Sequence, residues 1–127
     1  MLDYCIKKAK QNPILLESPD NKRGKAKASV AACLKIGRKI YVGFNQYKTH
    51  PLQKKFSQSD HLCHLHAEID AIAKALRHEA QSSLAGGKMY IARVHRSGKT
   101  AMAKPCRGCQ RALIYFNLKD VTWTTDA

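Results

Sequence analysis

The sequence HAEIDAIAKAL, residues 66–76, carries the clearest helical pattern in this chain of 127 residues. Its larger apolar positions recur every three to four residues, at Ile69, Ile72, Ala73 and Leu76. That spacing places them on one face of an α-helix, which then packs against a core. We therefore predict an amphipathic helix over residues 66–80, ended by the glycine pair that follows it.

The segments on either side of this helix alternate between apolar runs and polar turns. Apolar runs predict strands at residues 29–36, 39–44, 88–94 and 121–125. Helical spacing predicts further helices at residues 2–11 and after Pro105, and polar composition predicts loops at residues 17–27, 45–65 and 95–104. The order α-β-β-α-β-α-β contains two strand–helix–strand units, which imply crossovers, parallel strands and helices covering the sheet. We expect a single α/β domain over residues 1–127.

Charge is the unusual feature of the composition. Twenty-three Lys and Arg face nine Asp and Glu, which gives a formal net charge of +14. Residues 21–59 hold ten basic side chains and no acidic one. Such a field favours an anionic partner, namely a nucleotide, a nucleic acid or an anionic surface, although a basic surface that only aids solubility is the alternative.

The same composition excludes several protein classes. Apolar residues make up 44% of the chain and charged residues 25%, as in ordinary globular domains, which excludes a disordered tail or a coiled coil. No apolar run is long enough to span a membrane, so we expect no membrane partner. The N-terminus has an acid, Asp3, where a signal peptide has bases, so we expect a cytoplasmic protein. The odd count of five cysteines then argues against a disulfide scaffold.

Two short motifs carry metal-binding chemistry, and each opens a predicted helix. The first is His66-Ala67-Glu68, and the second is Pro105-Cys106-Arg107-Gly108-Cys109. The two cysteines are one helical turn apart at a helix start, where thiol pKa values fall and thiolates can bind one ion. With His66 as a third ligand, Zn²⁺ keeps an open position, which is typical of a catalytic site. A structural site with Cys63 or His64 as fourth ligand is the alternative.

Glu68 follows His66 by two residues and leaves the helix start in a different direction. It can therefore stand beside the metal without binding it, and carry a proton between water and a leaving group. The alternative is a first-turn glutamate that only complements the helix dipole.

The pattern H-x-E followed by P-C-x-x-C resembles the signature of zinc-dependent nucleobase deaminases. The chain is similar to the cytidine deaminase superfamily over nearly its whole length. The stretch from Gly43 to Pro51 further resembles small phage-type proteins described as deoxycytidylate or cytidine deaminase-like. The resemblance implies a three-layer α-β-α fold with a mixed sheet. Because the sequence stops two residues after Thr125, we expect the fifth strand and terminal helix of relatives to be absent.

The resemblance also implies roles for individual residues. His66, Cys106 and Cys109 would bind one catalytic Zn²⁺, and Glu68 would carry protons in the hydrolysis. Ala67, Asn45 and Pro105 would contact the substrate, with Asn45 placed at the end of the second strand as a substrate-binding Asn is in relatives. A plain turn residue is the alternative for Asn45.

Three functions remain open from the sequence. The favoured one is deamination of cytosine in a free nucleotide such as deoxycytidylate. The second is deamination of cytosine or adenine in single-stranded DNA or RNA, for which Tyr41, Phe44, Tyr47 and Phe56 could serve as stacking platforms. The third is an inactive zinc module that binds nucleic acid, against which the intact Glu68 argues. Relatives commonly assemble, so a homo-oligomer is also open.

Overall fold

The computed structural model describes residues 1–16, 28–57 and 64–126. Its helices are α1 (Leu2–Lys10), α2 (Pro51–Ser57), α3 (Ala67–Leu76) and α4 (Arg107–Tyr115), with 3₁₀ turns at Pro13–Leu16 and Gln81–Leu84. Its strands are β1 (Ala28–Ile36), β2 (Lys39–Phe44), β3 (Lys88–His95), β4 (Thr100–Ala101) and β5 (Asp120–Trp123). None of the helices described is long and apolar enough to cross a membrane.

The strands form one open sheet with β3 at its centre. β1 pairs antiparallel with β2 on one side and with β3 on the other. On the far side of β3, β4 pairs antiparallel near one end and β5 pairs parallel over residues 120–123. The parallel pairing follows from the crossover through α4, as the strand–helix–strand pattern predicts.

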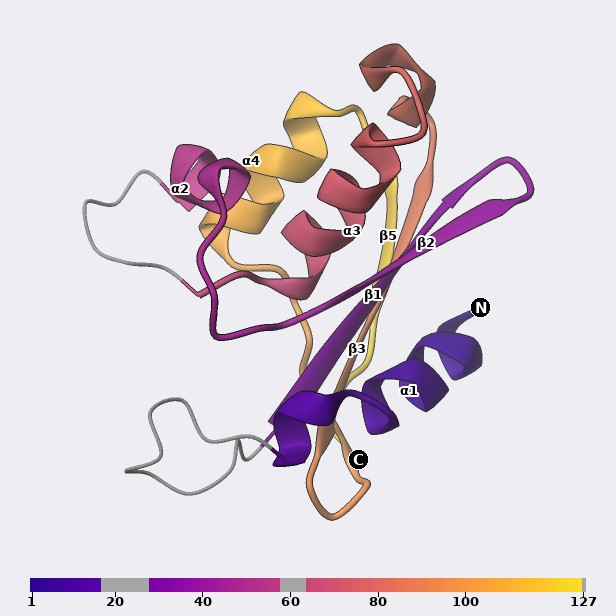
Figure 1. Cartoon of the computed structure of the whole chain (residues 1–127). Helices are drawn as coiled ribbons and strands as arrows, with labels where there is room; N and C mark the ends of the chain where they lie inside the picture. The colour runs from indigo at the N-terminus through magenta and orange to yellow at the C-terminus, as the bar shows by residue number, and fades with distance from the viewer. Residues whose placement is uncertain (17–27, 58–63, 127) are drawn as a thin grey trace.

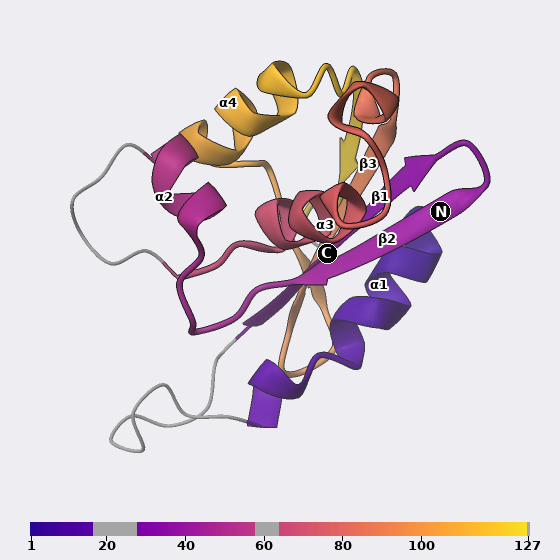
Figure 2. The same ribbon diagram turned by 45° about the horizontal axis from the view of Figure 1, so that its top comes forward.

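Helices cover both faces of the sheet (Figures 1 and 2). On β1, Ala32 and Leu34 face the main core, which also contains apolar side chains of α3 and α4. The intervening residues Ala31 and Cys33 face the opposite side and pack with Cys5 and Ala9 of α1. Because side chains alternate along a strand, both faces of β1 are buried, which explains why its sequence is almost continuously apolar. The Cys5 and Cys33 thiols are free and buried in the smaller core.

The prediction that the sheet lacks a fifth strand is wrong. The sheet has five strands, because β4 lies inside the segment 95–104 that was predicted as a loop. A strand of two residues has no room for an alternating pattern, and its partner β3, not its own sequence, brings it into the sheet.

The loop predicted over residues 45–65 is also partly wrong, because it contains α2. Pro51 stands at the first helical position, where its missing N–H costs nothing, and His50 Nδ1 accepts the Leu52 N–H at 3.0 Å. The central helix α3 ends at Leu76, four residues earlier than predicted. The predicted loop 17–27 lies outside the described residues, as do residues 58–63 of the second loop.

Candidate active site

Three metal-ligating side chains meet where α3 and α4 begin. His66 Nδ1 lies 3.5 Å from Cys106 Sγ and 3.4 Å from Cys109 Sγ. Donor atoms of all three residues lie within 4.8 Å of one another. Tetrahedral Zn²⁺, with bonds of about 2.1 Å to nitrogen and 2.3 Å to sulfur, separates such atoms by about 3.6 Å. The donor set and its spacing therefore fit a single Zn²⁺ ion.

Each ligand is held by the element on which it stands. Cys106 is the N-cap of α4, and its sulfur accepts the backbone N–H of Cys109 at 3.5 Å. His66 is the N-cap of α3, and its backbone N–H donates to Oε1 of Gln53 at 2.9 Å. Gln53 is fully buried on α2. The helix that sequence reasoning missed thus anchors the start of the metal-binding helix.

The two thiols of the metal-free protein differ in charge. Hydrogen bonds from Cys109 and His66 lower the pKa of Cys106 to about 3. The same hydrogen bond and burial raise the pKa of Cys109, so one thiolate forms at the expense of the other. The hydrogen bond with Cys106 raises the pKa of His66. A cation that replaces these protons can be held by both sulfurs as thiolates.

Within the ranges that the structure describes, no fourth protein donor joins the three. The ring of His64, one of the two alternative ligands, packs edge-on against Tyr47. The other alternative, Cys63, lies outside the described residues. Three protein donors leave one coordination position for a small molecule, which is the pattern of catalytic zinc sites.

Glu68 stands in the first turn of α3, beside the metal ligands but outside their group. Only 6% of it is exposed. Burial raises the pKa of its carboxyl group, because charge is costly away from water. A buried carboxyl group next to a metal site can accept and return a proton. A glutamate that only complements the helix dipole would not need to be buried there.

A cavity of about 310 Å³ opens over these residues. Two of the expected substrate contacts, Asn45 and Ala67, line it together with His66, Glu68 and Cys106. The third, Pro105, is buried and lines a separate apolar depression between α4 and β5. The structure therefore brings Asn45 and Ala67 to the metal site but directs Pro105 elsewhere.

Sequence reasoning did not identify two cationic residues of this cavity, Arg93 and Lys104, both of which are exposed. On β3 the buried side chains Met89 and Ile91 face the main core, and Arg93 continues the same alternation. The sequence held one signal for Arg93, namely a charged residue at a strand position whose side chain faces inward. At that end of β3, the alternation of side chains places it at the cavity and not in the core.

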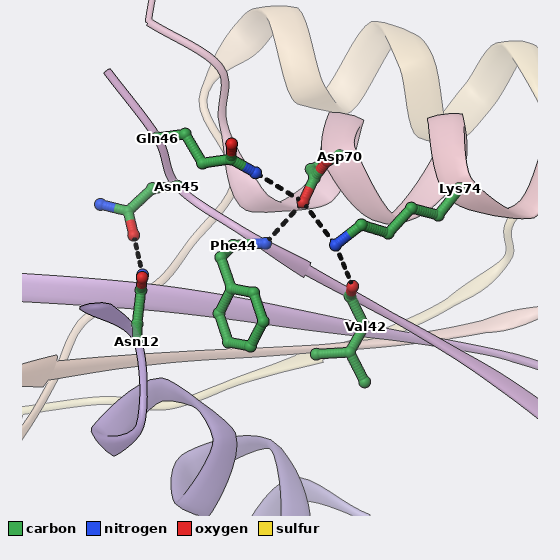
Figure 3. A network of polar contacts seen from close by, with 7 residues as sticks. All are labelled: Asn12, Val42, Phe44, Asn45, Gln46, Asp70 and Lys74. Carbon is green, nitrogen blue, oxygen red and sulfur yellow. Dashed lines mark hydrogen bonds and ion pairs between the residues drawn. The ribbon is translucent and has the colours of Figure 1, made fainter. Parts of the chain in front are cut away.

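Asn45 is held in place by polar contacts from three segments. Its Oδ1 accepts the Val30 N–H at 3.0 Å and the Nδ2 of Asn12 at 2.7 Å. On either side of it in sequence, the Phe44 N–H and the Gln46 Nε2 both donate to Asp70 at 3.0 Å (Figure 3). The loop that carries Asn45 is therefore fastened to α3, on which Glu68 also stands.

Comparison with known families adds a second line of evidence. The model for the cytidine and deoxycytidylate deaminase zinc-binding region matches residues 11–125. The chain belongs to this family. A search of curated protein sequences gave no match. The match covers the deaminase from the end of α1 through β5, and includes all three metal ligands and Glu68.

Family membership and the metal site together define the class of activity. The protein is a zinc-dependent deaminase of the cytidine type, which hydrolyses a C–N bond. Zinc, when bound, supplies Lewis-acid activation of water. His66, Cys106 and Cys109 are the residues that hold it.

Proposed function

We propose that this deaminase converts cytosine to uracil in a free nucleotide, with deoxycytidylate as the first candidate. The observation that carries the proposal is the cavity: about 310 Å³, with the metal ligands and Glu68 together with Arg93 and Lys104 in its lining. This volume lies at the lower end of the range for small-molecule sites. The two cations supply a place for one phosphate group.

In the reaction, the oxygen of water forms a bond to C4 of cytosine and the C4–N4 bond breaks. One proton of the water ends on the departing amine, which leaves as ammonia, and the other ends on N3 of uracil. We assign the proton transfers to Glu68, because it is the carboxylic acid among the residues that line the cavity with the metal ligands. Low exposure keeps bulk water from competing with it for these protons.

The remaining lining residues would bind and orient the nucleotide. Ala67 begins α3 between His66 and Glu68 and lines the cavity, so we assign its backbone to contact with the base. Asn45, which directly follows β2, contributes an amide to the same lining. A role for Pro105 in substrate binding stays a prediction that would need the depression between α4 and β5 to be part of the binding surface.

Single-stranded nucleic acid is the second candidate, because the net charge of +14 favours a polyanion. The aromatic side chains expected to stack on bases do not favour it. Phe56 is buried in the main core, and the hydroxyl of Tyr41 donates to Glu79 while its ring stacks on His78. Phe44 packs against the smaller core. Tyr47 is half-buried, as Tyr41 and Phe44 are, and its ring packs against His64.

The test is a panel of substrates offered to the zinc-loaded protein. Release of ammonia and a mass change from cytosine to uracil would be followed for deoxycytidylate, cytidylate, their nucleosides, adenosine, and cytosine-containing single-stranded DNA and RNA. Glu68→Ala is the inactive control. Turnover of a nucleotide supports the proposal, whereas turnover of the oligonucleotides alone overturns it.

A salt titration separates the two candidates independently. A polynucleotide contacts several phosphate-binding groups, so its KM should rise steeply with salt as counterions compete. A mononucleotide carries one phosphate group, so its KM should rise only weakly from 50 to about 200 mM salt. A steep rise for deoxycytidylate would contradict binding through a single phosphate.

A further inference from the structure

We infer that Asn12 is a positioning residue, which orients the Asn45 amide so that Asn45 presents its NH₂ group to the substrate cavity. The two side chains are joined by a hydrogen bond of 2.7 Å from Asn12 Nδ2 to Asn45 Oδ1 (Figure 3). The inference rests on the proposed role of Asn45 in binding the substrate. Asn12 belongs to the turn that follows α1, far in sequence from both motifs.

Two backbone N–H groups determine which end of each amide faces which partner. The Ile14 N–H lies 3.1 Å from Asn12 and can only donate, so the Asn12 atom facing it is the oxygen. The other end of Asn12, its Nδ2, therefore faces Asn45. The Val30 N–H likewise lies 3.0 Å from Asn45 and requires the oxygen of Asn45. Contacts with main-chain N–H groups therefore indicate both amide orientations. Without such contacts, the oxygen and nitrogen of an amide could be exchanged.

The consequence is that Asn45 has one polar end left. Its oxygen is occupied by two donors, and its backbone N–H donates to Val30 O at 3.2 Å. Its Nδ2 has no partner in the described part of the chain. Asn45 lines the cavity with His66 and Glu68 and also a neighbouring depression with Asn12, and the polar group that it has left for a ligand is a hydrogen-bond donor. The matching substrate atom must then be an acceptor oxygen or nitrogen.

Burial makes this arrangement expensive to disturb. Asn12 is 5% exposed, so its amide cannot turn to water without leaving the Ile14 N–H unpaired. If Asn12 lost its donor, the Asn45 oxygen would keep only the Val30 N–H. The orientation of the Asn45 amide would then rest on one hydrogen bond instead of two, so the alternative orientation would become more populated.

A residue that only shapes the turn would behave differently, and the substitution Asn12→Asp distinguishes the two roles. Aspartate keeps an oxygen for the Ile14 N–H, so the turn is retained. At pH 8 its ionised carboxylate has no proton to donate to Asn45. We expect KM for the nucleotide to rise about tenfold, the usual cost of one lost hydrogen bond, with a smaller change in kcat.

The matched control is Gln11→Glu, which makes the same change of charge on the neighbouring, exposed residue. It should leave KM unchanged. If Gln11→Glu raises KM as much as Asn12→Asp does, added negative charge explains the effect and the inference is wrong. Asn12→Ser, whose hydroxyl oxygen can still accept the Ile14 N–H, replaces Asn12→Asp if circular dichroism finds the latter unfolded.

A double-mutant cycle tests whether Asn12 acts through Asn45. In the Asn45→Ala background the Asn12→Asp change should raise KM no further, because the amide that Asn12 orients is gone. An equal tenfold increase in both backgrounds would overturn the inference, since Asn12 would then act independently of Asn45.

A spectroscopic readout separates this inference from the proposed function. In ¹⁵N spectra of the metal-loaded protein without substrate, Asn12→Asp should shift and broaden the Asn45 side-chain NH₂ signals, which Asn45→Ala identifies by their loss. The Ile14 amide should remain protected from exchange. An unchanged Asn45 signal refutes the positioning role. A shifted signal in a protein that converts no free nucleotide upholds that role and refutes the proposed substrate.

Discussion

Glu68 and His66 show how two residues of one helical turn acquire different tasks. His66 is the N-cap of α3 and directs its ring at two sulfurs, whereas Glu68 lies buried inside the first turn and is part of the cavity lining. The same helix start therefore places a metal-ligating ring beside a buried carboxyl group, to which we assign proton transfer.

The substitution Glu68→Gln tests this division. Glutamine has the same shape but cannot take up a proton, so kcat should fall by at least about a hundredfold, the lower range for a general acid–base group. Zinc content, measured by atomic absorption, should stay at one ion per chain. The matched control Glu79→Gln removes a carboxylate outside the cavity and should retain activity. Full activity in Glu68→Gln would refute its role as proton carrier.

Arg93 and Lys104 lead to a second prediction about single residues. Replacing either with Ala should raise KM for deoxycytidylate about tenfold, because a charge-assisted hydrogen bond to phosphate is lost. KM for deoxycytidine, which has no phosphate, should not change. Lys99→Ala is the control, since Lys99 is exposed in the same basic segment but does not line the cavity. Equal effects on nucleotide and nucleoside would contradict phosphate binding.

Among the elements, β2 has an open edge that α3 closes with side chains. Lys74 Nζ donates to Val42 O at 2.9 Å and lies 3.0 Å from Asp70, which accepts the Phe44 N–H (Figure 3). Gly43 makes the close approach possible, because a Cβ there would overlap backbone atoms of Ala67 and Ala71. Side chains of α3 thus hydrogen-bond the outward-facing backbone groups of β2. This contact also fixes the distance between Asn45, which follows β2, and Glu68 on α3.

We predict that Asp70→Ala lowers the free energy of unfolding by about 2 kcal/mol, because it leaves the Phe44 N–H and the Gln46 amide, both partly buried, without their acceptor. Urea unfolding measures the change, and amide exchange at Phe44 should accelerate. Lys39→Ala, which breaks the exposed ion pair with Glu79, should cost less than about 0.5 kcal/mol. Similar losses in the two variants would show that the β2 edge is not held by Asp70.

For the whole molecule, the metal site joins the starts of α3 and α4, two elements of the main core. Helix α2 also links these two helices: its Gln53 accepts the His66 N–H, and Arg111 of α4 donates to Phe56 O at 2.8 Å. Metal binding should therefore stabilise the fold as well as supply chemistry.

Removal of zinc with a chelator should lower Tm. A ligand that binds only the native state, at a thousandfold excess over its Kd, adds about 4 kcal/mol, which is roughly 15 °C for a domain of this size. Zinc should restore Tm and magnesium should not, since magnesium prefers oxygen donors. Cys106→Ser should abolish the zinc-dependent shift, whereas Cys33→Ala, in the other core, should retain it. A Tm unaffected by the chelator would contradict this linkage.

The regular elements were predictable from the sequence because their patterns are long enough to repeat. β1, β2, β3 and α4 occur where apolar alternation or helical spacing placed them, and α1 ends within one residue of its prediction. The metal ligands could also be identified, since zinc restricts both the type and the spacing of its ligands. α2 and β4 were missed because seven and two residues carry too little periodicity to outweigh a polar composition.

The sequence by itself determined the α/β class of fold and the three metal ligands, because repeating patterns mark the elements and zinc restricts the type and spacing of its ligands within each motif. It also predicted Glu68 as the proton carrier. Tertiary structure decided what surrounds them: that Arg93 reaches the cavity, that Gln53 holds His66, and that Asn12 orients Asn45. These contacts join residues separated by 13 or more positions, and they depend on strand pairing and helix packing. No local pattern records such pairings, so only the folded chain reveals them.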